Sequence, residues 1–113
     1  MTIYELGDIV LVPFPFSNLL TTKKRPAVVI SSTQYNILTA DIVIIAITSQ
    51  TQRVLGIGEC IIEDYQAAGL YKNSTIKPAI ATIEQTLVLK KLGKLSSNDL
   101  NSLNNSLKNT PKY

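Results

Sequence analysis

A permanent cation and a group of polar side chains stand at the ends of two apolar segments of this sequence. Arg25 immediately precedes one apolar segment, and the run Thr48-Ser49-Gln50 ends another. If the two segments form neighbouring antiparallel strands, these side chains meet at one edge of a sheet. An arginine guanidinium binds a phosphate through two parallel hydrogen bonds and stabilises negative charge on it, while a hydroxyl can bond to a phosphate oxygen or relay a proton. The pattern is compatible with phosphoryl transfer. By spacing alone, the commoner explanation is a loop charge before a proline and a strand that ends in polar residues.

The absence of histidine narrows the chemistry further. With no histidine and one cysteine, Cys60, the chain lacks the usual general base, the commonest metal ligand and the Ser–His or Cys–His nucleophile pairs. The carboxylates are scattered singly except for Glu63-Asp64, which is typical of a solvated turn, and Cys60 lies in an apolar run, as a buried small hydrophobe does. We therefore expect no metal and no other cofactor. RNA carries its own nucleophile, the 2′-hydroxyl, and can be cleaved without either.

The composition predicts one folded domain that spans residues 1–113. Apolar residues make up 45% of the chain and charged residues 17%, which is enough nonpolar surface for a core. The mean hydropathy of +0.17 is high for so small a domain, so self-association is expected to cover part of the surface. The net charge of +3 is compatible with a polyanionic partner.

Membrane insertion and export are not expected. The longest apolar run, 42–47, is far shorter than the ~20 residues that a spanning helix needs. Glu5 and Asp8 stand where a secretory signal carries basic residues, so the cytoplasm is the expected compartment.

Basic residues gather at three places, for each of which a solvated loop is the simpler explanation: Lys23, Lys24 and Arg25; Lys72 and Lys77; and Lys90, Lys91 and Lys94.

Five short segments have the composition of strands. They are rich in β-branched and aromatic residues and are separated by polar or glycine-containing stretches, among them the expected loops 17–24 and 67–74. The unbroken apolar segment 41–48 is typical of a strand buried on both faces. Pro13 and Pro15 restrict the end of the first segment to an edge or a bend. The expected strands cover residues 8–16, 26–31, 41–48, 56–63 and 74–84.

The C-terminal segment predicts a helix. Leu100, Leu103 and Leu107 recur at helical spacing, and Ser96 precedes Asp99 by three residues, as in a capping box. The many Asn and Ser residues have poor helix propensity, so the leucines are expected to pack on the sheet or on a second subunit. The fold class predicted is mainly β, a small curved β-barrel with a C-terminal helix.

These segments resemble the MazF/PemK family of bacterial toxin ribonucleases over essentially the whole chain. The matching stretches are GDIVLVPFPFS at 7–17, KRPAVVIS at 24–31, DIVIIAITSQ at 41–50, and ATIE with a following LGKLS between 81 and 96. The resemblance implies an SH3-like barrel of the CcdB/PemK type that forms a homodimer. It also implies cleavage of single-stranded RNA to 2′,3′-cyclic phosphate and 5′-hydroxyl ends, and neutralisation by a cognate antitoxin that lays an acidic segment across the RNA groove.

The resemblance also assigns roles to residues. Arg25 and Thr48 match the catalytic pair of the family: Arg25 would hold the scissile phosphate, and Thr48 would assist proton transfer or orient the phosphate. Thr82 would share the role of Thr48 if the fifth strand approaches the same end. The residues expected to contact RNA are Ser17, Lys23, Lys24, Ser49, Gln50, Lys72, Lys77 and Thr82.

The chain departs from the family pattern at 79–84. It has Ala-Ile-Ala-Thr-Ile-Glu there, where many members carry Gln-Ile-Arg-Thr-Ile-Asp, so Lys77 or Lys72 is expected to supply the positive charge.

The alternative function is a nuclease-inactive module of the same fold that binds RNA, an antitoxin or a topoisomerase. A barrel that only dimerises is a third hypothesis. Retention of Arg25 and Thr48 favours the enzyme.

Overall fold

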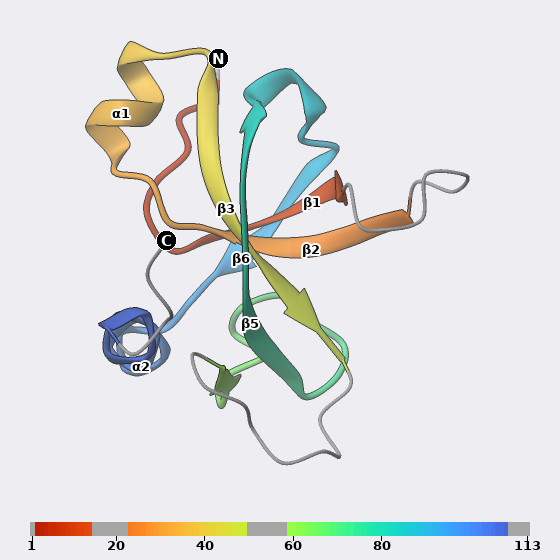
Figure 1. Cartoon of the computed structure of the whole chain (residues 1–113). Helices are drawn as coiled ribbons and strands as arrows, with labels where there is room; N and C mark the ends of the chain where they lie inside the picture. Colours follow the sequence, from red (N-terminus) through yellow and green to blue (C-terminus); the bar gives the residue numbers. More distant parts are fainter. Residues whose placement is uncertain (1, 15–22, 50–58, 109–113) are drawn as a thin grey trace.

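Six antiparallel strands form one strongly curved sheet in the computed structural model, which describes residues 2–14, 23–49 and 59–108. The strand order is β4-β5-β3-β2-β1-β6. Figure 1 shows β1 and β2 running across the direction of β3 and β5, which reflects the strong coiling of the sheet. The strands are β1 (Asp8–Phe14), β2 (Lys23–Val29), β3 (Asp41–Thr48), β4 (Cys60–Ile62), β5 (Ser74–Glu84) and β6 (Lys90–Lys94).

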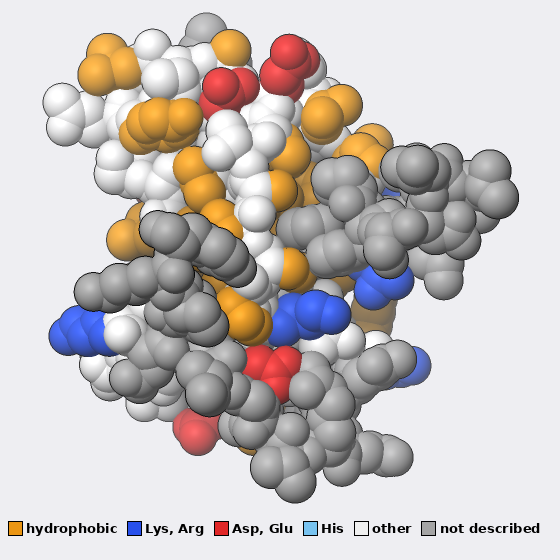
Figure 2. Space-filling view, viewed as in Figure 1, with side chains coloured by type: hydrophobic (Ala, Val, Ile, Leu, Met, Phe, Trp, Pro, Cys, Tyr) orange, Lys and Arg blue, Asp and Glu red, His pale blue; other side chains and the backbone are white. Residues whose placement is uncertain are grey.

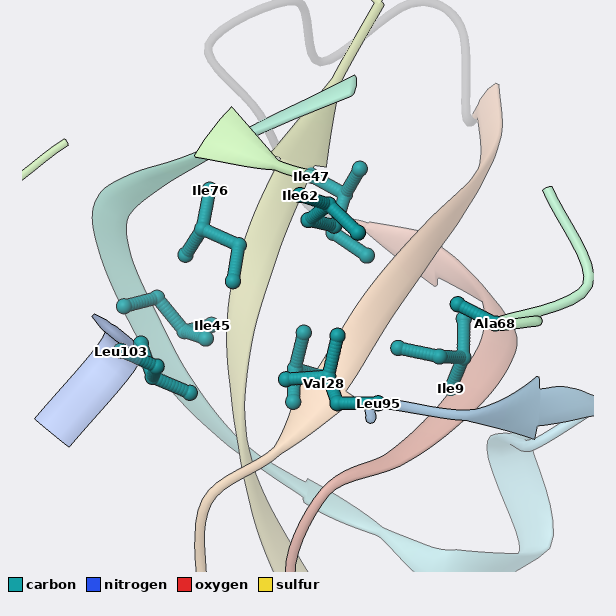
Figure 3. Close-up of a cluster of buried hydrophobic side chains, with 9 residues drawn as sticks. All are labelled: Ile9, Val28, Ile45, Ile47, Ile62, Ala68, Ile76, Leu95 and Leu103. Carbon is teal, nitrogen blue, oxygen red and sulfur yellow. The ribbon is translucent and has the colours of Figure 1, made fainter. Parts of the chain in front are cut away.

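The sheet buries apolar side chains on both faces. A first core cluster consists of Ile9, Val28, Ile45, Ile47, Ile62, Ala68, Ile76, Leu95 and Leu103 (Figure 3). A second core cluster consists of Val10, Val12, Ala27, Val29, Ile42, Ile44, Ala46 and Ile83. Because β3 contributes to both clusters, the expectation that this strand is buried on both faces is confirmed.

The C-terminal helix α2 (Ser97–Lys108) packs on the sheet as its leucine spacing predicts. Leu103 belongs to the first core cluster, and Leu100 and Leu107 pack against it. The Ser96 hydroxyl accepts a hydrogen bond from the Asp99 N–H at 3.2 Å, which confirms the N-terminal cap. No helix in the described part of the chain is long and apolar enough to cross a membrane.

Three elements were not expected from the sequence. β6 makes the sheet six-stranded rather than five-stranded, and it escaped notice because its sequence, KKLGK, has three lysines and a glycine. The helix α1 (Thr33–Leu38) is a short helix capped by the Ser32 hydroxyl, and η1 (Gln85–Leu87) is a single 3-10 turn; both are too short to show periodicity. The mainly β class with a C-terminal helix is confirmed.

The turn between β4 and β5, residues 63–73, is fixed at its start by α2. Asp99 is buried, and its two carboxylate oxygens accept hydrogen bonds from the N–H groups of Glu63 and Asp64, each at 2.9 Å. Asp99 therefore caps this loop rather than its own helix. The Asp64 carboxylate in turn accepts a hydrogen bond from the Ser96 hydroxyl. We call this segment the 63–73 loop.

Two glycines join the 63–73 loop to β6. Gly69 has a φ of +80°, and the Leu70 N–H donates to the Tyr65 carbonyl at 2.9 Å, as in a Schellman motif. A Cβ atom on Gly69 would lie 2.1 Å from the Leu92 carbonyl oxygen, and one on Gly93 would lie 2.4 Å from the Ala68 carbonyl oxygen. The two backbones touch where only glycine fits. The next residues of the loop, Tyr71 and Lys72, are thereby held beside β6.

Candidate functional site

A small cleft of about 290 Å³ lies where β2 begins and β3 ends. Its described lining residues are Lys24, Arg25, Pro26, Ile47, Thr48, Ser49 and Ser74. Ala27 is paired with Ala46, and the same antiparallel register, continued by two residues, puts Arg25 opposite Thr48 on one face of the sheet. Sequence and structure thus bring Arg25 and Thr48 together. We call this space the Arg25 cleft.

The Arg25 cleft combines positive charge with hydroxyl groups. Lys24 and Arg25 contribute the charge, and the described lining residues include no carboxylate. The backbone of Arg25 is kept extended because a proline follows it, and it pairs with Val12 of β1. A partly buried guanidinium beside hydroxyl groups is suited to bind a phosphate and to stabilise charge that develops on it.

A larger cleft of about 670 Å³ adjoins the Arg25 cleft. Pro26, Ser49 and Ser74 line both, so the two clefts are neighbours on the surface. The other described lining residues of the larger cleft come from β1, the 63–73 loop and β6: Leu11, Gly69, Leu70, Tyr71, Lys72, Lys90, Lys91 and Leu92. We call it the Tyr71 cleft. Figure 2 shows Lys and Arg side chains across the middle and lower part of one face of the molecule, with acidic side chains among them and at the upper end.

The residues expected to contact RNA fall into three groups. Lys24 and Ser49 line the Arg25 cleft, and Ser49 and Lys72 line the Tyr71 cleft. Lys77 and Thr82 lie on β5 and are not among the described lining residues of either cleft. Ser17, Gln50 and the side chain of Lys23 lie outside the described residues.

Thr82 is not brought to the same end of the sheet as Thr48. Thr75 is the residue of β5 that pairs with Thr48, whereas Thr82 pairs with Val43. At the rise of a β-strand this separates Thr82 from Thr75 by roughly 20 Å. Thr82 was expected to share the role of Thr48 only if the fifth strand brought it to the same end of the sheet. That condition is not met.

Sequence reasoning missed Tyr71, Lys90 and Lys91 as lining residues. Tyr71 is fully exposed, and the two lysines belong to the strand that was not expected. The available signals were an aromatic residue followed by a lysine in an expected loop, and the lysine pair of residues 90 and 91. Neither signal is specific without the contact between the 63–73 loop and β6.

Cys60 and the acidic pair 63–64 do not form a reactive centre. Burial, and next the charge of Asp99, raise the pKa of the Cys60 thiol to about 11, so it stays protonated at neutral pH. Cys60 packs against the first core cluster, in agreement with its expected role as a small hydrophobe. The Glu63 and Asp64 carboxylates are exposed and accept hydrogen bonds from Asn98 and Ser96. The described residues contain no group of three or more His, Cys, Asp or Glu side chains that could hold a metal ion.

Comparison with known proteins identifies the family. The family described as "PemK-like, MazF-like toxin of type II toxin-antitoxin system" matches residues 5–110. The chain belongs to this family. No curated protein sequence matches it.

Solved structures share the fold of this PemK/MazF-like chain. It superposes on MazF from Deinococcus radiodurans with a TM-score of 0.73 at 17% identity, covering 95% of this chain and 94% of that one. An endoribonuclease from a Mycobacterial species gives a TM-score of 0.72 at 19% identity, covering 95% and 89%. The Mycobacterium tuberculosis toxin MazF-mt6 gives 0.72 at 15% identity, covering 90% and 93%. The curved barrel expected from the sequence is thus the fold of the family.

Proposed function

We propose that this protein is a toxin endoribonuclease that cleaves single-stranded RNA with some sequence selectivity and without a metal ion. The observation that carries the proposal is the shared position of Arg25 and Thr48 in one cleft, at the ends of neighbouring strands. These residues match the catalytic pair that the family resemblance implies. Solved proteins of the same fold are described as endoribonucleases, which supports the same activity.

The reaction requires no metal and no cofactor. The 2′-hydroxyl oxygen of one nucleotide attacks the adjacent phosphorus, the bond from phosphorus to the 5′-oxygen breaks, and the proton that the 2′-hydroxyl loses is replaced, through Thr48 or solvent water, by the proton that the 5′-oxygen takes up. The products are a 2′,3′-cyclic phosphate and a 5′-hydroxyl. Arg25 binds the nonbridging oxygens and stabilises the additional charge in the transition state. Thr48 donates a hydrogen bond to the phosphate or relays the proton, while Lys24 attracts the RNA backbone.

An antitoxin and a second copy of the chain are the expected protein partners. Solved relatives of this fold include an endoribonuclease in complex with its cognate antitoxin and a MazE–MazF complex. An acidic segment of an antitoxin would compete with RNA for Lys24 and Arg25. A homodimer would cover some of the large hydrophobic side chains that are exposed on this chain, among them Ile37, Leu38, Ile80, Leu87 and Leu89. The cytoplasm, where mRNA is found, is part of the same proposal.

The test is incubation of the purified protein with a long single-stranded RNA in excess EDTA, followed by end-group analysis of the fragments. We expect cleavage with cyclic phosphate ends, and its loss in Arg25→Ala. Lys108→Ala is the matched control, because it removes one exposed positive charge at the end of α2. Intact RNA together with retained antitoxin binding would favour the alternative function, a nuclease-inactive binding module.

A further inference from the structure

We infer that the Tyr71 cleft holds the nucleotide next to the scissile phosphate, with its base stacked on Tyr71 and its phosphate bound by lysines. This inference rests on the proposed ribonuclease function and extends it to a second subsite. The two clefts share Pro26, Ser49 and Ser74 as lining residues, so they are close enough for one strand of RNA to reach both. An RNA strand bound at Arg25 would reach the Tyr71 cleft without leaving the protein surface.

The spacing across the sheet suits a neighbouring nucleotide. Leu11 of β1 is paired with Pro26 on one side and with Lys90 on the other. The residue that follows Arg25 therefore lies two strand spacings from Lys90, roughly 10 Å. That separation is within the reach of the nucleotide adjacent to a phosphate held by Arg25.

The chemistry of the walls suits single-stranded RNA. Lys72 and Lys90 bring positive charge, while the charge of the third lining lysine, Lys91, is paired with Asp8; no carboxylate is among the described lining residues. Tyr71 exposes its entire side chain beside them. An exposed aromatic ring stacks on any nucleobase, and lysines bind the phosphates on either side, which is the usual combination for single strands.

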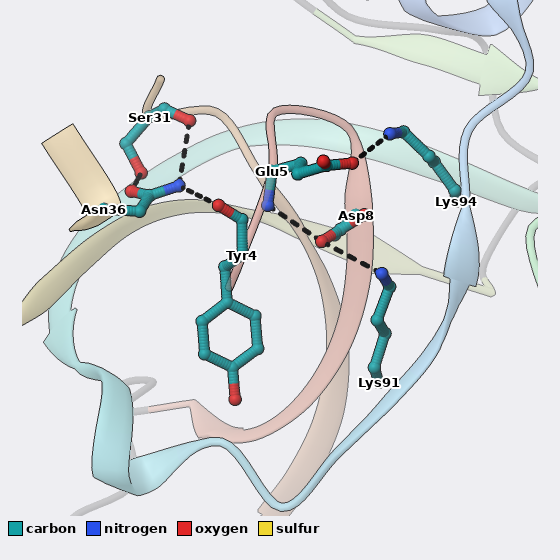
Figure 4. A network of polar contacts seen from close by, with 7 residues as sticks. All are labelled: Tyr4, Glu5, Asp8, Ser31, Asn36, Lys91 and Lys94. Carbon is teal, nitrogen blue, oxygen red and sulfur yellow. Dashed lines mark hydrogen bonds and ion pairs between the residues drawn. The ribbon is translucent and has the colours of Figure 1, made fainter. Parts of the chain in front are cut away.

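A buried carboxylate holds one of these lysines in place. Asp8 is fully buried; its Oδ2 atom lies 3.3 Å from Lys91 Nζ and accepts the Glu5 N–H at 2.9 Å (Figure 4). Its Oδ1 atom is buried and has no hydrogen-bond partner among the described residues. A carboxylate so far from water depends strongly on its cation, so the ion pair fixes the position of Lys91, a lining residue of the cleft whose side chain is partly exposed.

The backbone of the 63–73 loop, which carries Tyr71, is also held in place. The contact of Gly69 and Gly93 with opposing backbone fixes the 63–73 loop on β6. Tyr71 and Lys72 follow Gly69 directly, and the Ser74 hydroxyl donates a hydrogen bond to the Lys72 carbonyl at 2.9 Å. The ring and the three lysines thus come from two segments that are joined to each other, which lowers the cost of ordering the backbone that carries them on binding.

The test measures binding of random-sequence 2′-fluoro RNA decamers, which lack the attacking hydroxyl, to the full-length protein. We expect Tyr71→Ala to weaken binding about 10-fold and Tyr71→Phe to stay within about 2-fold of the parent, because the ring alone stacks. Tyr35→Ala, which removes a partly exposed ring from α1, is the matched control. Lys90→Gln is expected to reduce the slope of log Kd against log salt by about 0.7, and Lys108→Gln is expected to leave it unchanged.

The outcomes separate this inference from the proposed function. Equal decamer binding by Tyr71→Ala and the parent would overturn the subsite, while cleavage of long RNA that depends on Arg25 would still stand. Decamer binding that needs Tyr71, in a protein that cleaves nothing, would support the subsite and reject the nuclease. If the Tyr71 and Lys90 variants lose affinity for an acidic peptide of polyglutamate and not for the decamers, the cleft is a protein-binding surface and the inference is wrong.

Discussion

The two adjoining clefts are built in different ways. The Arg25 cleft stands on the ends of the central strands β2 and β3, where the pairing of Ala27 with Ala46 sets which side chains meet. The Tyr71 cleft is assembled from the edge strand β6 and a loop that precedes β5. One depends on strand register and the other on contacts between segments far apart in the sequence. Changes at the first should alter chemistry with little effect on stability. Changes to the backbone contacts that hold the second cleft together should lower stability.

The largest effect is expected from Arg25→Lys. The substitution keeps the positive charge and the position on β2, but lysine lacks the planar fork that binds two phosphate oxygens at once. We expect the rate of RNA cleavage to fall by about 10²-fold, as for the loss of one transition-state donor. The measurement is single-turnover cleavage at saturating protein. A variant that cleaves as fast as the parent would show that Arg25 acts only through its charge.

The second largest effect is expected from Gly93→Ala, which tests the backbone contact between β6 and the 63–73 loop. The added Cβ would lie 2.4 Å from the Ala68 carbonyl oxygen, so the two backbones must separate. We expect a loss of about 2–3 kcal/mol in unfolding free energy from this overpacking, measured by urea denaturation. Gly7→Ala is a useful contrast. Unlike Gly93→Ala it strains a positive φ, but its Cβ would meet only the Leu100 side chain, at 3.6 Å. If Gly93→Ala is as stable as the parent, the contact between β6 and the 63–73 loop is not rigid.

A smaller loss is expected from Asp99→Asn, which tests the other end of the 63–73 loop. The Asp99 carboxylate accepts hydrogen bonds from two backbone N–H groups, whereas an asparagine offers one oxygen and turns its NH₂ group toward the second N–H. We expect a loss of about 1–2 kcal/mol in unfolding free energy. Asn98→Ala is the control, since it removes a hydrogen bond to the exposed Glu63 carboxylate on the same turn of α2. Equal losses in the two variants would mean that burial of the carboxylate does not matter.

The same contrast explains what could be predicted from the sequence. Strand composition and the leucine spacing predict the central strands and α2 because these depend on local periodicity. Arg25 and Thr48 can be placed together because antiparallel strand ends meet in a fixed register. Tyr71 and Lys90 could not, because their proximity depends on Gly69 and Gly93, whose backbone contacts leave no periodic signal.

The role of Asp99 shows the same limit at the level of one hydrogen bond. Its spacing from Ser96 predicts a cap for the helix, and the Ser96 half of that prediction is confirmed. The carboxylate instead caps the 63–73 loop, since tertiary packing brings two N–H groups that need acceptors within its reach. A local motif fixes where a helix begins, but not which distant backbone its side chains satisfy.

The smallest effect is expected at the exposed ion pair between Glu5 and Lys94, which ties the segment before β1 to β6. The two side chains are 2.6 Å apart and about half exposed, and the hydrogen bond from Lys94 is the main reason that the pKa of Glu5 lies below its ordinary value of 4.5. Because the folded pKa is lowered, the stabilisation is present above that ordinary value and is lost as the pH falls through the folded pKa. The same hydrogen bond raises the pKa of Lys94, so the stabilisation is also lost at strongly alkaline pH.

A double-mutant cycle with Glu5→Gln and Lys94→Gln, followed by urea denaturation at pH 7 and pH 3, isolates this pair. We expect a small favourable coupling at pH 7 that is weaker at pH 3 and weaker in high salt, because exposed pairs are screened. Asp8 of β1 and Lys91 of β6 form a second ion pair, in which Asp8 is fully buried and Lys91 is partly exposed. Their coupling should exceed that of Glu5 and Lys94 and resist salt. If both couplings respond alike to salt, burial does not distinguish the two pairs, and Asp8 cannot be what holds Lys91 at the Tyr71 cleft.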